Sequence, residues 1–459
     1  MEQASVVVCG AGIGGLAAAH ELAVRRGRRD VVIVDPLPPL SLTSDKSTEC
    51  YRNWWPGPGS TLVRLMNRSI DRLEELERTS GGRLALNRAG YLYLTGVPAT
   101  ARELERQGRE ISALGAGALR VHRPGDDERA YPPLRLDGCD PTLDGADLLL
   151  DPRRIQRLFP GLAGDAVAAL HARRCGWLSA QQLGMELLDR ARDAGARLVA
   201  GRVVAIEVQR GAVQEVVIET NDGQRQRVRT ATVVDAAGPH AAEVAGLAGV
   251  ELPLTCELHG KVFFDDHLGV VPRELPLTIW CDPIELAWSE EERAGIAADP
   301  ALAPLLRPLP AGMHFRPEGG RASRWLLLLW TYHLEPVPPV FPPRFDPVYP
   351  EVAVRGLARM VPAAAAYLER GMRKPRVDGG YYCKTRENRP LVGPTPVAGF
   401  HLFCGLSGYG IMASQGLAEL LGGWVAGGEL PDDAGEFLLS RYADAAYRAR
   451  LDALTSGQL

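Results

Sequence analysis

A cluster of three glycines, Gly10, Gly12 and Gly15, lies between two strongly apolar runs near the start of the chain. The run before the cluster, residues 6–8, is all valine, which suits a buried strand of a parallel sheet. The stretch after it, LAAAHELAVRRG, is typical of a helix, and DVVIVDP supplies a second buried strand. This order of strand, glycine turn, helix and strand predicts the opening unit of a parallel α/β sheet.

The glycine spacing GxGxxG suits a turn that binds phosphate. The first glycine permits a tight turn, the second lets a pyrophosphate approach the backbone, and the third lets helix and strand pack closely. Asp35 ends the second strand, where an acid can bond the hydroxyls of an adenosine ribose. We therefore expect a dinucleotide site, with Ile13 and Gly14 of the same turn as further contacts. NAD(P) and FAD both remain open at this point, although the N-terminal position favours FAD.

Two later stretches repeat the pattern of strand, small-residue turn and helix. In residues 231–249 the turn contains Ala237 and Gly238, and in residues 400–428 it contains Gly405, Ser407, Gly408 and Gly410. Small residues let the chain run close to a flat ring, and the helix that begins near Ile411 offers unpaired N–H groups to the negative charge of a reduced flavin. NAD(P) has no use for a second glycine cradle so far along the chain, whereas an extended FAD has. The later turns therefore indicate FAD.

The composition excludes several classes of protein. The net charge of -4 gives no basic face for nucleic acid, and the apolar run WLLLLW is too short to span a membrane. The eight cysteines show no CxxC pair and no metal-ligand spacing. We expect reduced, mostly buried thiols in a cytoplasmic protein, and no metal site. The oligomeric state stays open.

The order of elements along the 459 residues predicts two interleaved domains. Helices are expected over residues 61–78 and 99–115, a strand over 89–96, and a separate antiparallel sheet with proline-rich connections over 250–375. The expected fold class is α/β (α+β overall), with a Rossmann-like FAD-binding domain interrupted by a mostly antiparallel β-sheet substrate domain. The FAD-binding domain takes residues 1–85, 150–250 and 378–459, and the substrate domain takes residues 86–149 and 251–377.

Five segments, spread over almost the whole chain, resemble the D-amino-acid oxidase superfamily, which includes glycine oxidase, sarcosine oxidase and dimethylglycine dehydrogenase. They are VVVCGAGIGGLAAAHEL, STECYRNWWPG, GWLSAQQLGMELLDRARDAGARLVAGRVV, VVDAAGPHAAEVAGLAG and GGYYCKTRENRPLVGPTPVAGFHLFCGLSGYGIMAS. The resemblance implies a GR2-type FAD domain with a substrate sheet over the flavin. It also implies oxidation of an amine or amino acid, in which hydride passes from the carbon beside nitrogen to flavin N5 and an imine results.

The resemblance extends the expected FAD contacts. Ser47 and Thr48 fall in the loop that bonds the pyrophosphate or ribityl chain. Further contacts are expected at Val203, Tyr409, Ile411 and Met412. Gly380 occupies the position of the cysteinyl attachment site, and no histidine occurs between His20 and His122, where another attachment type needs one. We therefore expect FAD to be held without a covalent bond.

The resemblance also implies substrate contacts. Arg52 falls where sarcosine oxidase-like sequences place an arginine near flavin and substrate, so its guanidinium is expected to hold a carboxylate, with Trp54 beside it. Tyr382 falls where glycine oxidase-like members carry a carboxylate-binding arginine and sarcosine oxidase-like members a tyrosine. Tyr409 stands where some members have histidine, and Lys261 lies near a lysine that assists reaction with oxygen.

Two carboxylate anchors of the family are missing, because Tyr382 and Met412 replace an arginine and a lysine. Arg316 is a candidate substitute, and a structural role for it is equally compatible with the sequence. The aromatic residues expected around the pocket favour a substrate larger than glycine or sarcosine, such as a cyclic secondary amine or a biosynthetic intermediate.

The sequence leaves three alternatives open. The electron acceptor is either oxygen or a protein, so the chain is an oxidase or a dehydrogenase. A 2-hydroxy-acid dehydrogenase of the same superfamily would need a histidine base, for which His259 and His314 are candidates. An electron-transferring flavoprotein subunit of a multi-subunit dehydrogenase is the third alternative.

Overall fold

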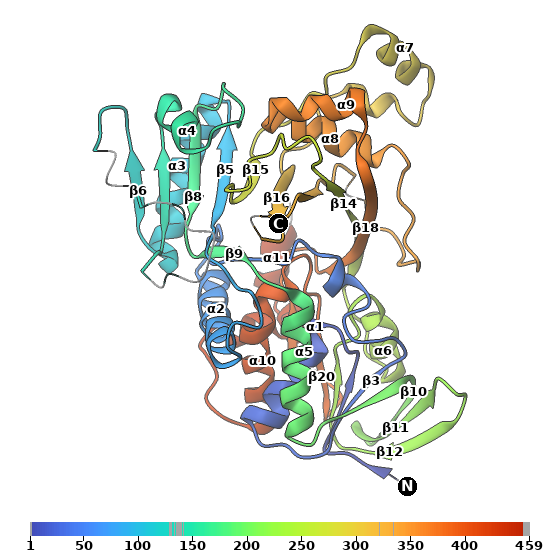
Figure 1. Cartoon of the computed structure of the whole chain (residues 1–459). Helices are drawn as coiled ribbons and strands as arrows, with labels where there is room; N and C mark the ends of the chain where they lie inside the picture. The colour runs from blue at the N-terminus through green and yellow to red at the C-terminus, as the bar shows by residue number, and fades with distance from the viewer. Residues whose placement is uncertain are drawn as a thin grey trace.

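The computed structural model describes residues 2–127, 131–132, 134, 140, 142–320, 322–333 and 335–452. Two nine-stranded sheets organise this part of the chain, one in the lower and one in the upper half of Figure 1. A third, two-stranded sheet of β4 (Cys50–Arg52) and β9 (Cys175–Trp177) lies where the two halves meet. No helix among the described residues is long and apolar enough to cross a membrane.

The first sheet has five parallel strands at its centre. Their order is β10 (Arg197–Gln209), β3 (Val31–Asp35), β2 (Val6–Cys9), β13 (Val233–Asp235) and β20 (Phe400–Cys404). Antiparallel strands extend it on both sides, namely β11 (Ala212–Thr220) and β12 (Arg225–Arg229) beyond β10, and β19 (Leu391–Pro394) beyond β20. The short β1 (Glu2–Gln3) pairs with β12 at the edge.

Helices cover both faces of the first sheet. On one face pack α1 (Ile13–His20), α2 (Thr61–Thr79), α5 (Ala180–Asp193) and α10 (Gly410–Ala426), and on the other lies α6 (Ala241–Leu247). Val6 and Val8 belong to the core under the four helices, whereas Val7 belongs to the core on the α6 side. Because β2 is buried on both faces, its run of valines is uninterrupted.

The second sheet has the order β18 (Arg373–Lys384), β14 (Thr255–Asp265), β17 (Trp325–Leu329), β16 (His314–Glu318), β15 (Leu277–Trp280), β5 (Tyr91–Thr95), β8 (Ala168–Ala172), β7 (Ala146–Leu149) and β6 (Leu119–His122). Its neighbours are antiparallel except for two pairs, β15 with β5 and β6 with β7. The helices of this half are α3 (Pro98–Ile111), α4 (Pro152–Leu158), α7 (Glu290–Ala298), α8 (Tyr349–Met360) and α9 (Ala366–Arg370). Near the C-terminus, α11 (Ala445–Asp452) follows.

The predicted fold class, a parallel nucleotide-binding sheet with a mostly antiparallel second sheet, is confirmed. The helices predicted over residues 61–78 and 99–115 correspond to α2 and α3. The predicted domain boundaries stay a prediction. Two strands complicate them: β8 lies within the range 150–250 yet pairs in the second sheet, and β18 begins before residue 378 in that same sheet.

The expectation that all eight cysteines are reduced is wrong at two positions. Cys256 on β14 and Cys383 on β18 lie directly opposite each other and form a disulfide, with their Cα atoms 4.2 Å apart. They are 127 residues apart in the sequence, so only the antiparallel pairing of the two strands brings them together. The cysteines at 9, 50, 175, 281 and 404 are free, and Cys139 lies outside the described residues.

Candidate functional site

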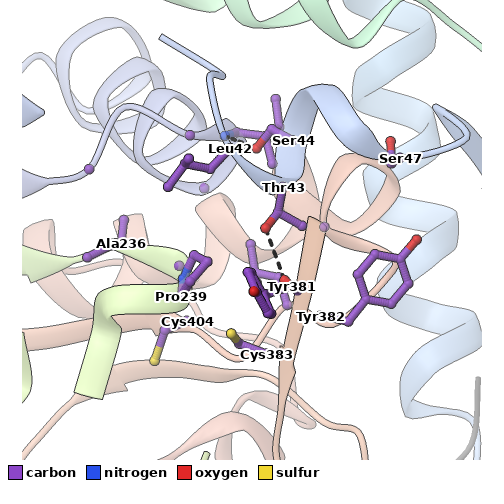
Figure 2. A pocket seen from close by; sticks show the side chains of 18 of the residues that line it. Leu42, Thr43, Ser44, Ser47, Ala236, Pro239, Tyr381, Tyr382, Cys383 and Cys404 are labelled. Carbon is purple, nitrogen blue, oxygen red and sulfur yellow. Dashed lines mark hydrogen bonds between the residues drawn. The ribbon is translucent and has the colours of Figure 1, made fainter. Parts of the chain in front are cut away.

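A cavity lies at the carboxyl ends of the central strands of the first sheet, where α/β sheets bind their ligands (Figure 2). Its walls come from the turns after β2, β13 and β20, from the loop between β3 and β4, and from β18. We call it the cofactor cavity. The sequence-predicted residues that line it are Gly10, Gly12, Ile13, Gly14, Asp35, Ser47, Ala237, Gly238, Gly405, Ser407, Gly408, Gly410 and Ile411.

The first glycine turn has no room for side chains. Gly10 has a φ of +106°, and a Cβ there would lie 2.5 Å from the carbonyl oxygen of Ala236, which follows β13. A Cβ on Gly15 would lie 1.9 Å from the carbonyl oxygen of Gly10, so Gly15 supports the turn from beneath rather than lining the cavity. The Ile13 N–H, at the start of α1, donates to Ser44 Oγ at 3.0 Å. The N-terminus of α1 therefore lies in the cavity wall opposite the Ser44 hydroxyl, and a helix N-terminus favours the binding of phosphate.

Asp35 lines the cavity beside this turn. One of its carboxylate oxygens accepts from the Ala11 N–H at 2.7 Å and the other from the Leu37 N–H at 2.8 Å. Burial raises the pKa of Asp35, and the two backbone hydrogen bonds oppose this shift. Each carboxylate oxygen has a second lone pair, so both remain able to accept from a ribose hydroxyl.

The turn after β20 forms the other end of the cofactor cavity. Its backbone is in the left-handed region at Gly405 and Ser407, with φ of +69° and +52°. The Ser407 N–H donates to the Cys383 carbonyl at 2.9 Å, while the buried Ser407 Oγ has no hydrogen-bond partner among the described residues. A Cβ on Gly408 would lie 2.3 Å from the ring of Tyr382. A bound polar ligand would satisfy the hydroxyl, and the missing side chain gives a flat ring room to approach.

A second cavity adjoins the first, and we call it the substrate cavity. Ser47, Tyr382, Gly408 and Ile411 line both cavities, so these residues mark the boundary. Its volume is about 570 Å³, within the range of small-molecule sites. Seven large aromatic side chains form much of its wall: Trp55, Tyr91, Tyr93, Trp280, Trp330, Tyr382 and Tyr409.

Arg52 brings a positive charge into this aromatic wall. Its Nη1 donates to Tyr93 Oη at 2.6 Å, and its guanidinium carbon lies 4.2 Å from the centroid of the Trp55 ring. Within the described residues, no carboxylate lies within ion-pair distance of Arg52. A half-buried guanidinium held by neutral partners in a cavity wall is a suitable site for a carboxylate.

A row of three polar side chains, Thr331, His259 and Glu257, borders the same cavity. His259 stacks on Tyr382, with ring centroids 3.8 Å apart. Its Nδ1 lies 2.8 Å from Thr331 Oγ1, and its Nε2 lies 3.4 Å from a carboxylate oxygen of Glu257. Burial lowers the pKa of His259, while the Glu257 carboxylate opposes the shift. Burial therefore favours the neutral ring, and both of its nitrogens have polar partners.

The remaining predicted contacts fall elsewhere. Thr48, Tyr409 and Met412 line the substrate cavity, and Val203 is buried in β10 away from both cavities. Trp54 lines a separate small cavity beside Arg52, while its neighbour Trp55 lines the substrate cavity.

Two predicted cationic contacts line neither cavity. Arg316 is fully buried and pairs with Glu318 at 2.7 Å and with Glu49 at 3.4 Å, so its charge is compensated within the protein. The Lys261 amine donates to the carbonyls of Asp45 and Ser47, at 3.2 and 3.1 Å.

Sequence reasoning missed most of the loop between β3 and β4. Thr43 and Ser44 lie above the cofactor cavity, and the Thr43 hydroxyl donates to the Tyr381 carbonyl at 3.0 Å (Figure 2). The hydroxyl-rich run SLTS was the available signal for a phosphate-facing loop. Cys383 and Cys404 also line this cavity, and no local pattern indicated it.

The glycine cradles at both ends of one elongated cavity define a protein that binds a dinucleotide with two phosphates and a flat ring system. The family model described as FAD dependent oxidoreductase, DAO, matches residues 5–424. The chain belongs to this family, and FAD is its cofactor. The unpartnered Ser407 hydroxyl and the side-chain-free cradles fit that cofactor.

Solved structures share the fold at low sequence identity. The L-proline dehydrogenase from P. horikoshii superposes with a TM-score of 0.73 at 17% identity, over 96% of this chain and 98% of that chain. Glycine oxidase from Geobacillus kaustophilus gives 0.70 at 19%, over 96% and 99%. Iminodiacetate oxidase from Chelativorans sp. BNC1 gives 0.69 at 18%, over 94% and 98%. No curated protein sequence matches the chain.

Proposed function

We propose that this FAD-dependent oxidoreductase oxidises a carboxylate-bearing amine, either a secondary amine or an amino-acid derivative, at the carbon beside nitrogen to give an imine. The observation that carries the proposal is Arg52, a half-buried guanidinium without a carboxylate partner among the described residues, in a cavity that adjoins the cofactor cavity. The names of the similar structures, a proline dehydrogenase, a glycine oxidase and an iminodiacetate oxidase, support this substrate class. FAD, when bound, supplies the acceptor for the hydride, which carries both electrons of the oxidation.

In this proposal, the residues of the chain bind and orient the substrate and exclude water from the site. Arg52 holds the carboxylate through two parallel hydrogen bonds. Tyr382, at the boundary between the cavities, and Tyr409, in the wall of the substrate cavity, position the reacting carbon. Trp55 packs edge-on against Tyr409 with ring centroids 5.1 Å apart. The aromatic walls keep water from the reacting centre. Ser47 and the three glycine turns hold FAD without a covalent bond.

The size of the cavity supports a substrate larger than glycine. A volume of about 570 Å³ with aromatic walls suits a cyclic or aryl-bearing amine better than a molecule of a few heavy atoms. The electron acceptor, oxygen or a protein, is the part of the proposal that activity measurements must decide.

A second candidate is oxidation of a 2-hydroxy acid. The chain from Thr331 through His259 to Glu257 favours it, because removing hydride from a carbon that bears a hydroxyl requires a base for the hydroxyl proton. The same Arg52 would hold the carboxylate of either substrate.

The decisive experiment is anaerobic reduction of the FAD-loaded protein, followed by the loss of absorbance of oxidised flavin. A panel would pair each cyclic or N-alkyl amino acid with the 2-hydroxy acid of matching shape. Faster reduction by the amines supports the main proposal, and faster reduction by the hydroxy acids supports the second. Reduction by neither series contradicts both. Release of hydrogen peroxide on admitting air identifies an oxidase, and reoxidation only by an added acceptor identifies a dehydrogenase.

A further inference from the structure

The Cys256–Cys383 disulfide separates the cofactor cavity from a further cavity, which we call the outer cavity. Cys383 lines both of these cavities, and Cys256 lines the outer one. Gly238 and Pro239, which follow β13, also line both, so the wall at this point is thin. Figure 2 shows Cys383 beside Tyr381 and across the cavity from the loop that carries Thr43 and Ser44. The disulfide is therefore part of the wall that encloses the cofactor.

The outer cavity gives external molecules access to the disulfide. Its volume is about 350 Å³, and its lining includes the proline-rich segment 336–339 and residues of α6. Cys256 is half-buried, whereas Cys383 is buried. The Val337 N–H donates to the Cys256 carbonyl at 2.8 Å, which fixes the segment beside the disulfide. Cys256 is the more exposed of the two cysteines, so we expect an external thiolate that enters this cavity to attack its sulfur.

Three successive residues of β18 join the disulfide to the cofactor cavity. The Tyr381 carbonyl accepts from the Thr43 hydroxyl at 3.0 Å, and the Tyr382 ring packs against Gly408. The Cys383 carbonyl accepts from the Ser407 N–H at 2.9 Å. The disulfide links this end of β18 to β14. It therefore also restrains the loop that carries Thr43 and the turn that carries Ser407 and Gly408.

We propose that Cys256–Cys383 is a thiol–disulfide exchange site that sets the affinity for FAD, and that its reductant is an external dithiol. The thiolate of the dithiol attacks Cys256 Sγ, the bond between the two cysteine sulfurs breaks, and Cys383 leaves as a thiolate that takes up a proton. The second thiol of the reductant, as its thiolate, then attacks the reductant's first sulfur, which is bonded to Cys256 in the mixed disulfide. Cys256 is released as a thiolate. Two electrons pass to the protein disulfide, and the dithiol becomes a disulfide. The inference needs the FAD site but not the proposed substrate.

The test measures FAD binding rather than turnover. Apoprotein prepared without reductant is digested and analysed by mass spectrometry, and a linked peptide containing Cys256 and Cys383 is expected. FAD affinity is then measured by fluorescence titration before and after treatment with dithiothreitol. We expect the dissociation constant to rise about three- to tenfold on reduction, the equivalent of roughly one hydrogen bond. Removing the dithiol and reoxidising the same sample should restore the original value.

Variants separate this disulfide from the other thiols. The double variant C256S/C383S should bind FAD with the affinity of the reduced protein and show no response to the dithiol. C175S alters a free cysteine that lines neither cavity and should keep the full response. If the double variant does not fold, the reversible change in the unsubstituted protein carries the test. Absence of the linked peptide, or equal affinities before and after reduction, overturns the proposal. Binding of FAD without amine oxidation leaves it intact.

Discussion

Arg52 Nη1 donates a hydrogen bond of 2.6 Å to Tyr93 Oη, so the half-buried guanidinium is held by a neutral phenol. Arg316 differs from Arg52, because Arg316 is fully buried and pairs with two glutamates. A guanidinium cannot lose its proton in a protein, so the charge of Arg52 favours an anion in the cavity.

Replacing Arg52 with lysine should weaken binding of a carboxylate-bearing substrate by about ten- to hundredfold, because a point charge cannot make two parallel hydrogen bonds. The matched control is Tyr93→Phe, which leaves the guanidinium in place and removes only its neutral partner; we expect less than about a fivefold effect. The measurement is the substrate concentration that gives half-maximal flavin reduction without oxygen. Equal effects of the two substitutions would contradict the role of Arg52 as carboxylate anchor.

Gly15→Ala should destabilise the protein by about 2 kcal/mol or more and reduce FAD binding, because the new Cβ would overlap the Gly10 carbonyl oxygen. Gly246→Ala is the matched control. Gly246 lies in α6 with open space where the new methyl group would lie, so the substitution should stabilise by about 0.5–1 kcal/mol. Denaturant unfolding of both variants measures the difference. A G15A protein that is stable and binds FAD would contradict this prediction, because the Gly10 carbonyl could then move away from the new methyl group without loss of binding.

The cofactor cradles could be predicted from the sequence because each is local. The strand, the glycine turn and the helix of the first cradle occupy consecutive residues, and so do those of the turn after β20. The substrate cavity was harder, because its walls come from strands distant in the chain. The sequence prediction named Trp54, whereas Trp55 lines the substrate cavity, since neighbouring side chains after a short strand point in different directions.

The disulfide and one of the two ion pairs of Arg316 join residues that are distant in the chain. Cys256 meets Cys383 only because β14 and β18 pair in one particular alignment, and a shift by one residue would separate them. Arg316 meets Glu49 across a separation of 267 residues, so its sequence context gave no sign of the ion pair.

The folded protein should lose stability as the pH falls below about 6.5. Burial lowers the pKa of five described histidines, at positions 20, 171, 259, 314 and 401. These histidines stay neutral in the folded chain while their unfolded counterparts take up protons, so stability is complete above the unfolded pKa and falls on acidification toward the folded pKa. Each contributes at most about 1.4 kcal/mol per pH unit.

His20→Gln tests this pH dependence directly. The pKa of His20 is lowered to about 4, so the variant should flatten the dependence of the unfolding free energy between about pH 6.5 and 4. Ala294→Gln, which adds the same amide side chain at an exposed, non-titrating position of α7, is the control and should leave the slope unchanged. Denaturant unfolding across this range gives the slopes. Identical slopes for H20Q and the unsubstituted protein would show that His20 is not a source of the acid sensitivity.

Lys261→Met distinguishes a lysine that positions the cofactor loop from one that assists reaction with oxygen. The amine donates to the carbonyls of Asp45 and Ser47, and Ser47 lines both cavities. Loss of these hydrogen bonds should weaken FAD binding about three- to tenfold, while the oxygen reaction of FAD-saturated protein stays the same. Lys374→Met, at an exposed position of the neighbouring strand β18, should change neither quantity. A slower reaction with oxygen at unchanged FAD affinity would instead favour the role in oxygen activation that the sequence resemblance implies.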